Sequence, residues 1–441
     1  GVEADLIRIQ FDWVGAFLNA ENDRVEYARP PPRYPMPEGC DLLRIDKALY
    51  GQLQSAACWH KHMAQGLLED GFVESPTAKC LYVRPEMNGE PASIIFIHVD
   101  DGCIITTNKA AANRVLRSLN AKNELESEEM GWYIGLKVEE KEDGGIRISG
   151  PAYIDEMLAK YGMTDCNPKL LPADPNVVLK KNDGERFTCP YQEAVGSLNY
   201  ASCKFRPDIT YQVNKLASYC SNPSKTHWTA VKHLLAYLKG TKDKGVCIKK
   251  TTEKGTTLLQ AVRNCKLEVY TDSDYAMDAD TRKSTSRFTI QLNGNLVYWS
   301  SKKQPVIAQS TAEAETIAGC DGTKYAEFIR KALHEIEMIL CGKSKAMNKG
   351  EKNSHVTHWK SKATHPITVF TDNKAAELVA NSGDFTKRMK HIDVRYYYQA
   401  EQVAKGIVTV QHVPGAENPA DLFTKPVKQP VFRKLVILLV Q

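Results

Sequence analysis

The stretch Ser93–Thr107, SIIFIHVDDGCIITT, places two adjacent carboxylates between two short apolar runs. The β-branched residues on both sides and the Asp101-Gly102 pair predict a tight β-hairpin with its turn at that pair. Asp100 and Asp101 then have two interpretations. They are ordinary turn residues, since Asp and Gly are common in turns, or they hold a cation at the tip of a rigid hairpin. The rest of the chain has to decide between the two.

Length and composition indicate a multidomain chain of ordinary globular composition. A chain of 441 residues is too long to fold around a single hydrophobic core. At about 150 residues per domain, we expect about three domains. The net charge of +5 permits a polyanionic partner without demanding one. The twelve cysteines form no C-x-x-C pair, which argues against a zinc ribbon and favours a reducing, intracellular environment. No apolar run has membrane-spanning length and no signal peptide is recognisable, so no membrane partner is expected.

The first part of the chain alternates strand-like and helical patterns, which predicts an α+β domain over residues 1–166. The run from Leu6 to Leu18 alternates and then becomes apolar, as a buried strand entering a turn would, with Asp12 in its middle. Because the chain begins with Gly1 and enters this strand almost at once, we expect it to be a fragment of a longer polypeptide. The further expected elements are a helix from Lys47 to about Glu69, a helix from Ala110 to Leu119, and strands over Tyr133–Glu139 and Gly145–Ser149.

The sequence after residue 166 predicts a small helical domain followed by a second α/β domain. Apolar residues recur at helical spacing between Tyr191 and Lys239, so residues 167–257 are expected to form helices and a connection. A new α/β pattern runs from about Leu258 to residue 435. The polar, Lys-rich stretch over residues 343–365 is expected to be a solvated insertion. In such a loop a metal at His355 and His358 is less favoured than plain solvation.

Acidic residues of the last domain recur at the ends of expected strands. LEVYTDSD ends a strand at Asp272, ITVFTDN ends another at Asp372, and the strand IVTVQHV leads through a loop to Asp421. Each alone is explained equally well as a strand-end cap or turn residue. Carboxylates gathered at one sheet edge raise each other's pKa and cost stability unless a cation lies among them. The pattern therefore predicts a pair of divalent metals at this edge.

Two glutamates follow in the same domain, and they receive different interpretations. Ser310-Thr311-Ala312-Glu313 fits a capping box, in which Glu313 reaches back to the N-cap amide. Glu315 has no such local explanation. It shares a helix face with the small residues Gly319, Gly322 and Ala326, which suits close packing on a sheet. We therefore predict that Glu315 points inward to the carboxylates.

A series of short motifs runs along almost the whole chain in a fixed order. They are FDWVGAFLNA, KALYGQLQSAACW, HVDDGCIIT, WYIGLKVE, VGSLNYASCKFRPDIT, HWTAVKHLLAYLKGT, VYTDSDYA, TRKSTS, SSKKQP, STAEAE, TDNKAA, KHIDVRY and PADLFTKP. In these motifs the chain resembles the reverse transcriptase and ribonuclease H region of copia-type LTR retrotransposon polyproteins. The resemblance implies a mixed α+β and α/β multidomain fold: a right-hand polymerase palm (1–166), a helical thumb and connection (167–257), and a ribonuclease H-like mixed-sheet domain (258–435).

The resemblance also implies a polymerase site. Asp12 and Asp100, with Asp101 beside them, would hold two Mg²⁺ ions for nucleotidyl transfer, with Mn²⁺ as the alternative ion. Phe17 would lie under the nucleotide sugar and exclude a 2′-hydroxyl, although a core aromatic is the simpler interpretation of that residue. Other implied substrate-binding residues are Tyr50, Gly51 and Gln54 at the nucleotide pocket, His98 near the primer end, and Trp132 in the primer grip.

For the last domain the resemblance implies a nuclease that cleaves RNA paired with DNA. Its metal ligands would be Asp272, Glu315, Asp372 and Asp421, again with two ions. Phosphate contacts would come from Lys387, Arg388, Lys390 and His391, for which a solvated basic helix start is an equal alternative. The implied partners are an RNA template, a DNA primer, the RNA–DNA hybrid, deoxynucleoside triphosphates and the rest of the polyprotein. The implied location is an intracellular, cytoplasmic virus-like particle, with the nucleus as a further compartment.

Several positions depart from the family pattern. His98 replaces a tyrosine, Leu53 and Ala57 replace basic residues, and Met277 and Arg287 replace glycines. The fingers segment that normally precedes Asp12 is missing, which fits a fragment or a decayed copy. Three hypotheses remain: a reverse transcriptase joined to a ribonuclease H, a fragment with ribonuclease H activity only, and a non-catalytic remnant that binds nucleic acid.

Overall fold

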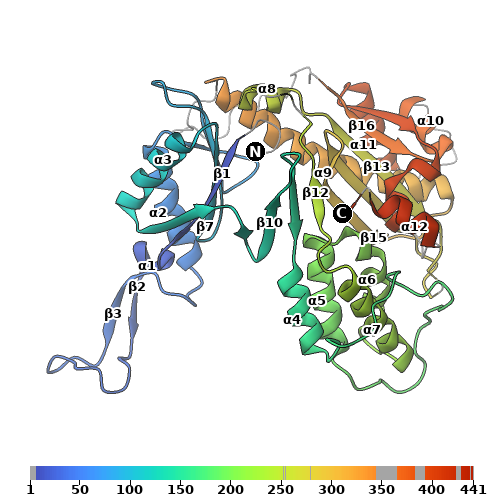
Figure 1. The fold of residues 1–441 in the computed structure, drawn as a ribbon, viewed down its shortest axis with the longest axis horizontal. Helices are drawn as coiled ribbons and strands as arrows, with labels where there is room; N and C mark the ends of the chain where they lie inside the picture. Colours follow the sequence, from blue (N-terminus) through green and yellow to red (C-terminus); the bar gives the residue numbers. More distant parts are fainter. Residues whose placement is uncertain are drawn as a thin grey trace.

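The computed structural model describes residues 6–251, 253, 255–278, 280–343, 365–382, 393–423, 429–437 and 439–440. Figure 1 shows these residues as an arch. One limb contains the first sheet with its helices, and the other contains a helical bundle and a second large sheet. A long helix, α9, runs across the top between the limbs. His355 and His358 lie outside the described residues.

The first limb contains a six-stranded sheet with helices packed on it. Ile9, Phe11 and Trp13 alternate along strand β1 and share one buried cluster with Trp59 of α2 and Leu116 of α3. The sheet has the order β4-β5-β6-β7-β1-β8. The elements are β1 (Ile7–Trp13), α1 (Ala16–Asn19), α2 (Ser55–Glu69), β4 (Val73–Glu74), β5 (Leu81–Arg84), β6 (Ser93–His98), β7 (Asp101–Thr106), α3 (Lys109–Lys122) and β8 (Leu125–Glu129).

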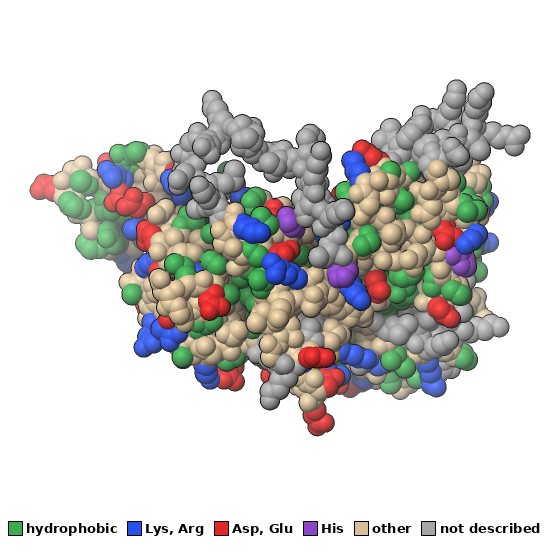
Figure 2. Space-filling view, turned by 90° about the horizontal axis from the view of Figure 1, so that it is seen from above, with side chains coloured by type: hydrophobic (Ala, Val, Ile, Leu, Met, Phe, Trp, Pro, Cys, Tyr) green, Lys and Arg blue, Asp and Glu red, His purple; other side chains and the backbone are tan. Residues whose placement is uncertain are grey.

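A two-stranded hairpin, β2 (Glu21–Ala28) and β3 (Leu43–Lys47), projects from this limb (Figure 1). The prediction of a helix starting at Lys47 is therefore wrong, because Lys47 pairs with Glu21 in the hairpin. The helix begins at Ser55, whose hydroxyl donates to the Leu49 carbonyl at 2.6 Å. Hydrophobic side chains lie on the surface of the projection (Figure 2), and they include Val25, Tyr27, Tyr34 and Leu42.

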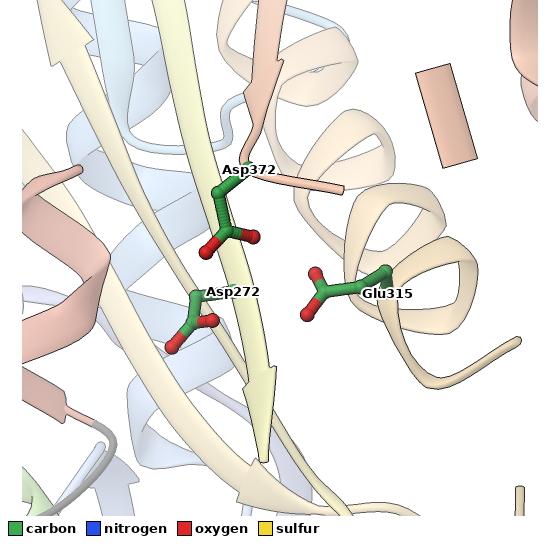
Figure 3. Close-up of side chains that lie close together, drawn as sticks. All are labelled: Asp272, Glu315 and Asp372. Carbon is green, nitrogen blue, oxygen red and sulfur yellow. The ribbon is translucent and has the colours of Figure 1, made fainter. Parts of the chain in front are cut away.

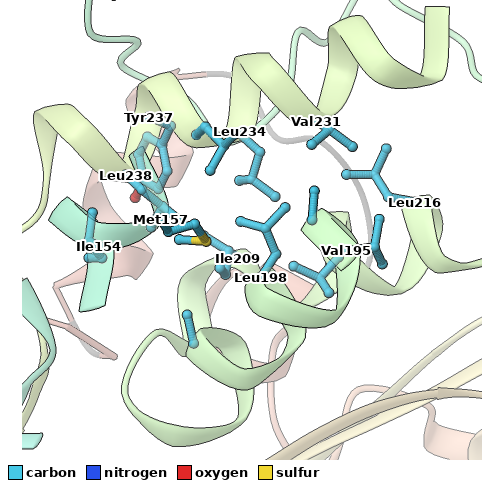
Figure 4. Packing of buried hydrophobic residues seen from close by; sticks show 14 of the residues in the cluster. Ile154, Met157, Val195, Leu198, Ile209, Leu216, Val231, Leu234, Tyr237 and Leu238 are labelled. Atoms are coloured by element: carbon cyan, nitrogen blue, oxygen red, sulfur yellow. The ribbon is translucent and has the colours of Figure 1, made fainter. Parts of the chain in front are cut away.

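The middle of the chain forms a small sheet and a bundle of helices. The sheet has the order β12-β11-β10-β9. Its edge strand β12 follows the helices in the sequence, whereas the other three strands precede them. Helices α4 to α7 enclose a cluster that includes Met157, Leu198, Val231 and Leu234 (Figure 4). The elements are β9 (Trp132–Tyr133), β10 (Leu136–Glu140), β11 (Ile146–Ser149), α4 (Pro151–Lys160), α5 (Tyr191–Lys204), α6 (Thr210–Ala217), α7 (Lys225–Gly240) and β12 (Val246–Ile248).

A buried ion pair ties this bundle together. Arg206 donates from Nη2 to Asp208 Oδ2 at 2.7 Å and from Nη1 to the Thr241 carbonyl at 2.9 Å. The Tyr237 hydroxyl donates to the same Asp208 oxygen at 2.6 Å. Burial alone would raise the pKa of Asp208, but the Arg206 charge and these hydrogen bonds outweigh it and lower the pKa. The pair therefore fixes the turn after α5 to the end of α7.

The second limb contains a five-stranded sheet of order β15-β14-β13-β16-β17. Strand β13 is antiparallel to β14 and parallel to β16, and α9 packs across these strands. A Cβ on Gly322 would lie 2.8 Å from Val269 Cγ1, so the small face of α9 permits this close approach, as predicted. The elements are α8 (Leu258–Arg263), β13 (Leu267–Asp274), β14 (Thr285–Leu292), β15 (Asn295–Lys303), α9 (Thr311–Leu340), β16 (Ile367–Thr371), α10 (Lys374–Ser382), α11 (Asp393–Ala404), β17 (Val408–His412) and α12 (Gln429–Val436).

The second sheet and its helix α9 contact both the first limb and the helical bundle. Glu335 of α9 accepts hydrogen bonds from the hydroxyls of Ser75 and Thr77 and, at 3.1 Å, from the Thr77 amide. On the other side, the Trp299 indole donates to the Ser202 carbonyl at 2.7 Å. The predicted mixed α/β class with several sheets is confirmed, and the limits 166 and 257 stay predictions.

None of the described helices combines the length and the apolar composition that crossing a membrane requires.

Replacing Asp208 with Asn should destabilise the helical bundle by about 3–5 kcal/mol, because the Arg206 charge would stay buried without its partner. Urea unfolding followed by far-UV circular dichroism at pH 7 measures this. The control is Glu193→Gln, which breaks the exposed Lys160–Glu193 pair and should cost about 1 kcal/mol or less. Equal effects of the two variants would contradict a structural role for the buried pair.

Candidate functional site

The first acidic group lies where β1 and the β6–β7 hairpin meet. Asp12 of β1 pairs directly with Asp101 of β7, and the Trp13 amide donates to the Asp100 carbonyl at 3.3 Å. His98 is the cross-strand partner of Asp101 on the other side. Strand pairing thus brings Asp12, Asp100 and Asp101 together from segments far apart in the sequence.

The predicted hairpin is present, but its turn is not at the Asp-Gly pair. His98 pairs with Asp101, so the two turn residues are Val99 and Asp100, and Gly102 lies within β7. A Cβ on Gly102 would lie 2.2 Å from the Phe11 ring, so this glycine makes room for a core aromatic.

The turn carries backbone strain at Val99. Its φ of 64° is unfavourable for a β-branched residue. The buried Trp59 indole donates to the Val99 carbonyl at 2.6 Å and holds the turn in this conformation. A strained backbone fixed by packing from beneath gives the adjacent Asp100 a defined position.

The three carboxylates influence one another's protonation. Partial burial, followed by the charges of Asp100, Asp101 and Glu126, raises the pKa of Asp12. Burial and the charge of Asp100 raise the pKa of Asp101, which the neighbouring His98 lowers in part. This mutual effect is expected of like charges that a cation would stabilise.

The implied substrate-binding residues of the first domain have differing local surroundings. Phe17 is half-buried and its ring lies 4.6 Å from that of the exposed Tyr50. Gln54 is buried, and its amide donates to Asn22 at 3.1 Å and to Glu26 at 3.0 Å, so it also anchors β2. Gly51 has a φ of +97°, which a turn before α2 requires. Trp132 in β9 is 48% exposed.

The second acidic group is tighter. One carboxylate oxygen from each of Asp272, Glu315 and Asp372 lies within 4.8 Å of the other two. Figure 3 shows the three side chains pointing toward one another from β13, from α9 and from the end of β16. Within the described ranges, Asp12, Asp100 and Asp101 do not form a group as close as this one.

Of the two glutamates of α9, Glu315 lies as the sequence predicts, whereas the capping box predicted at Glu313 forms only in part. The Glu313 amide donates to the Ser310 hydroxyl at 3.1 Å, and Glu313 Oε2 accepts from the Gln309 amide at 2.6 Å, one residue before the N-cap amide that we expected. Glu315 is 6% exposed and points inward. Its Oε1 accepts from the Ser273 amide at 3.0 Å and hydroxyl at 2.9 Å, while its buried Oε2 has no hydrogen-bond partner among the described residues.

The protonation of this group is strongly shifted. Burial, followed by the charges of Asp272 and Asp372, raises the pKa of Glu315 to about 8. Burial also raises the pKa of Asp272 to about 6, with Arg287 opposing and Asp372 and Asp421 adding to the effect. At neutral pH the site therefore holds a proton that a divalent cation would displace.

Asp421 lies beside this group rather than in it. The buried Asn418 donates to the Thr271 carbonyl at 2.9 Å and accepts from the Ala420 amide at 3.0 Å, which fixes the turn Pro419–Phe423 against β13. The structure thus brings Asp421 near Asp272, although its oxygens are outside the three-residue cluster.

Two residues of this site were not identified from the sequence as part of it. Arg287, noted only as a replaced glycine, is fully buried and lies opposite Asp272 in the β13–β14 pairing. It contacts Asp272 at 3.4 Å and Asp274 at 2.8 Å. The spacing of TDSD, which puts Asp274 on the same strand face as Asp272, was the available signal. Lys387, Arg388, Lys390 and His391 lie outside the described residues.

The sequence is similar to those of several known proteins. Residues 2–175 match the family described as reverse transcriptase (RNA-dependent DNA polymerase). The chain is 29% identical over 428 residues to the retrovirus-related Pol polyprotein from transposon RE2 of Arabidopsis thaliana, covering 96% of the chain and 27% of that polyprotein. It is 27% identical over 441 residues to the one from transposon TNT 1-94 of Nicotiana tabacum, covering 97% and 30%. Over 140 residues it is 38% identical to secreted RxLR effector protein 161 of Plasmopara viticola, covering 32% and 91%.

Residues 2–175 thus match the reverse transcriptase family, and over nearly its whole length the chain is similar to Pol polyproteins of copia-type transposons. The resemblance read from the motifs is therefore confirmed. The chain spans about 27% to 30% of the length of these two polyproteins.

The raised pKa values predict that the metal-free protein loses stability as the pH rises from about 5 to 8.5. The folded state holds protons on Glu315 and Asp272 that the unfolded state has released, so each rise in pH favours unfolding. Glu315→Gln should flatten this dependence and be more stable than the wild type at pH 8.5 by roughly 1–3 kcal/mol.

Unfolding with urea in the presence of EDTA, at a series of pH values, measures this effect. Added Mg²⁺ should restore stability to the wild type at pH 8.5 more than to Glu315→Gln. The matched control is Glu313→Gln, two residues away on the same helix, which should keep the wild-type slope. A wild-type stability independent of pH would contradict the strained cluster.

Proposed function

We propose that this chain is the reverse transcriptase and ribonuclease H region of a retrotransposon polyprotein, with a divalent-cation site at each acidic group. The observation that carries the nuclease part is the convergence of Asp272, Glu315 and Asp372. The donor set fits Mg²⁺ or Mn²⁺, since both prefer carboxylate oxygens. In the part of the chain that the structure describes, the buried Glu315 Oε2 has no hydrogen-bond partner, and such an ion would satisfy it.

In the nuclease site the protein supplies fixed negative charge and orientation. When bound, divalent cations activate the attacking water and neutralise the RNA phosphate. Ser273 holds one oxygen of Glu315, which leaves the other to face the ion. Asn418 keeps Asp421 beside Asp272, so Asp421 would add negative charge next to an ion held there. The substrate is proposed to be the RNA strand of an RNA–DNA hybrid, recognised by duplex shape and 2′-hydroxyls.

In the polymerase site the hairpin supplies a rigid platform. Asp12 and Asp100 are proposed to hold Mg²⁺ against the triphosphate of an incoming deoxynucleotide, with an RNA template and a DNA primer in place. The fixed Val99 turn supports this role, because misplacing a substrate by about 1 Å can cost about 100-fold in rate. The palm, thumb and ribonuclease H assignment, the limits 1–166, 167–257 and 258–435, and work inside a cytoplasmic particle belong to this proposal.

A second candidate is a chain that retains only the nuclease, or only nucleic-acid binding. Leu53, where the family has a basic residue, is 99% exposed and offers no charge to a triphosphate. The tighter carboxylate cluster belongs to the nuclease site. These observations favour nuclease activity over polymerase activity in the chain as it stands.

The chain should therefore cleave the RNA of a labelled RNA–DNA hybrid in the presence of Mg²⁺, with little primer extension by the same preparation. Asp372→Asn should abolish cleavage, because it removes one of the three converging carboxylates. The control Glu377→Gln alters a nearby carboxylate that pairs with Lys374 and should keep activity. Strong primer extension, or cleavage unchanged by Asp372→Asn, would overturn this assignment.

The polymerase assignment has its own test at Phe17, in a longer piece of the polyprotein that extends primers. Phe17→Val should allow ribonucleotide incorporation, because the ring that would block a 2′-hydroxyl is gone. Leu18→Val, at the next and more exposed position of α1, is the matched control and should leave sugar selectivity unchanged. If Phe17→Val extends primers with wild-type selectivity, Phe17 is only a packing residue.

A further inference from the structure

Arg287 stands out as a fully buried cation inside the nuclease site. It is 0% exposed, and it lies directly across the strand pair from Asp272. Its Nη1 is 3.4 Å from Asp272 Oδ2, and its Nη2 is 2.8 Å from Asp274 Oδ2. Its guanidinium carbon also lies 5.6 Å from the ring centroid of Tyr211, which belongs to α6.

The position of the Arg287 guanidinium affects how many divalent ions Asp272 could bind. A carboxylate shared by two divalent ions turns one oxygen to each ion. One oxygen of Asp272 faces the guanidinium, and both Asp272 and Asp421 act on Arg287 by their charge. Arginine keeps its proton in proteins, so this charge is permanent. It lies 3.4 Å from one oxygen of a carboxylate that also takes part in the cluster with Glu315 and Asp372.

We propose that the Arg287 guanidinium takes the place of a second divalent ion at Asp272, so that the nuclease site binds one ion, among Asp272, Glu315 and Asp372. The proposal rests on the divalent-cation site proposed above. A permanent cation beside Asp272 repels a second ion and stabilises the carboxylates when no ion is bound. Asp274 and the Tyr211 ring hold the guanidinium there, so it does not leave when the first ion binds.

The number of bound ions tests this directly. The full chain carrying Asp12→Asn and Asp100→Asn, which removes ion binding at the hairpin, is titrated with Mn²⁺ and free Mn²⁺ is counted by electron paramagnetic resonance. One bound ion is expected, without the magnetic coupling of a close Mn²⁺ pair. Arg287→Met in the same background should bind a second ion, or bind the first at least about tenfold more tightly. Arg287→Lys keeps the charge and should behave as the parent.

Controls separate the effect of charge from that of a lost buried arginine. Arg330→Met removes another buried arginine, which belongs to α9 and whose charge partner is Glu327, and should leave the Mn²⁺ count unchanged. Circular dichroism verifies folding of each variant. If Arg287→Met does not fold, Arg287→Gln, which also removes the charge, replaces it. The number of Mn²⁺ ions bound by Arg287→Gln is then compared with the number bound by the parent.

The outcomes distinguish the two proposals. Two coupled Mn²⁺ ions in the parent, or identical binding by Arg287→Met and the parent, would overturn the role of Arg287 and leave the metal site intact. Binding that survives Glu315→Gln unchanged, or no binding by any variant, would overturn the metal site itself and the inference with it. A single ion lost on Glu315→Gln, together with tighter or additional binding by Arg287→Met, supports both.

Discussion

Mutual repulsion among the carboxylates of the buried Asp272 and Glu315 and the less buried Asp372 is the constraint on which this site depends. Three carboxylate oxygens within 4.8 Å of one another are held by packing, not by their own attraction. The small face of α9 lets Glu315 approach β13, Asn418 ties the Asp421 turn to that strand, and Ser273 binds one Glu315 oxygen. The strain is relieved by protons, by Arg287 or by a divalent ion, and the competition among these three sets the chemistry.

The carboxylates at the β6–β7 hairpin also repel one another, but they are less buried. Asp12, Asp100 and Asp101 are placed by strand pairing at an accessible edge, so water shares in screening their charges. The position of the hairpin turn is fixed by Trp59, whose indole donates a hydrogen bond to the Val99 carbonyl and so holds Val99 in an unfavourable backbone conformation. One site is thus close-packed and nearly complete, whereas the other is a platform whose remaining charge must come from elsewhere. This difference is the physical reason to expect unequal activities from the two.

Much of this arrangement could be predicted from sequence, because periodicity and local capping are local properties. Helical spacing separated the inward Glu315 from the capping Glu313, and strand ends located Asp272 and Asp372. The turn was misplaced because Gly102 serves a distant ring, Phe11, and no local pattern shows that. Similarly, the pairing of Arg287 with Asp272 depends on the register of β13 with β14. The start of α2 was missed because Leu43–Lys47 pairs with a strand that the sequence did not reveal.

The central claim is that the converging carboxylates bind a divalent cation. A crystal of the full chain grown or soaked with Mn²⁺, and measured by anomalous diffraction at the manganese edge, tests this most directly. The account predicts an anomalous peak in contact with oxygens of Asp272, Glu315 and Asp372. Saturating Mn²⁺ with no peak among these three side chains, while their positions are unchanged, would contradict it.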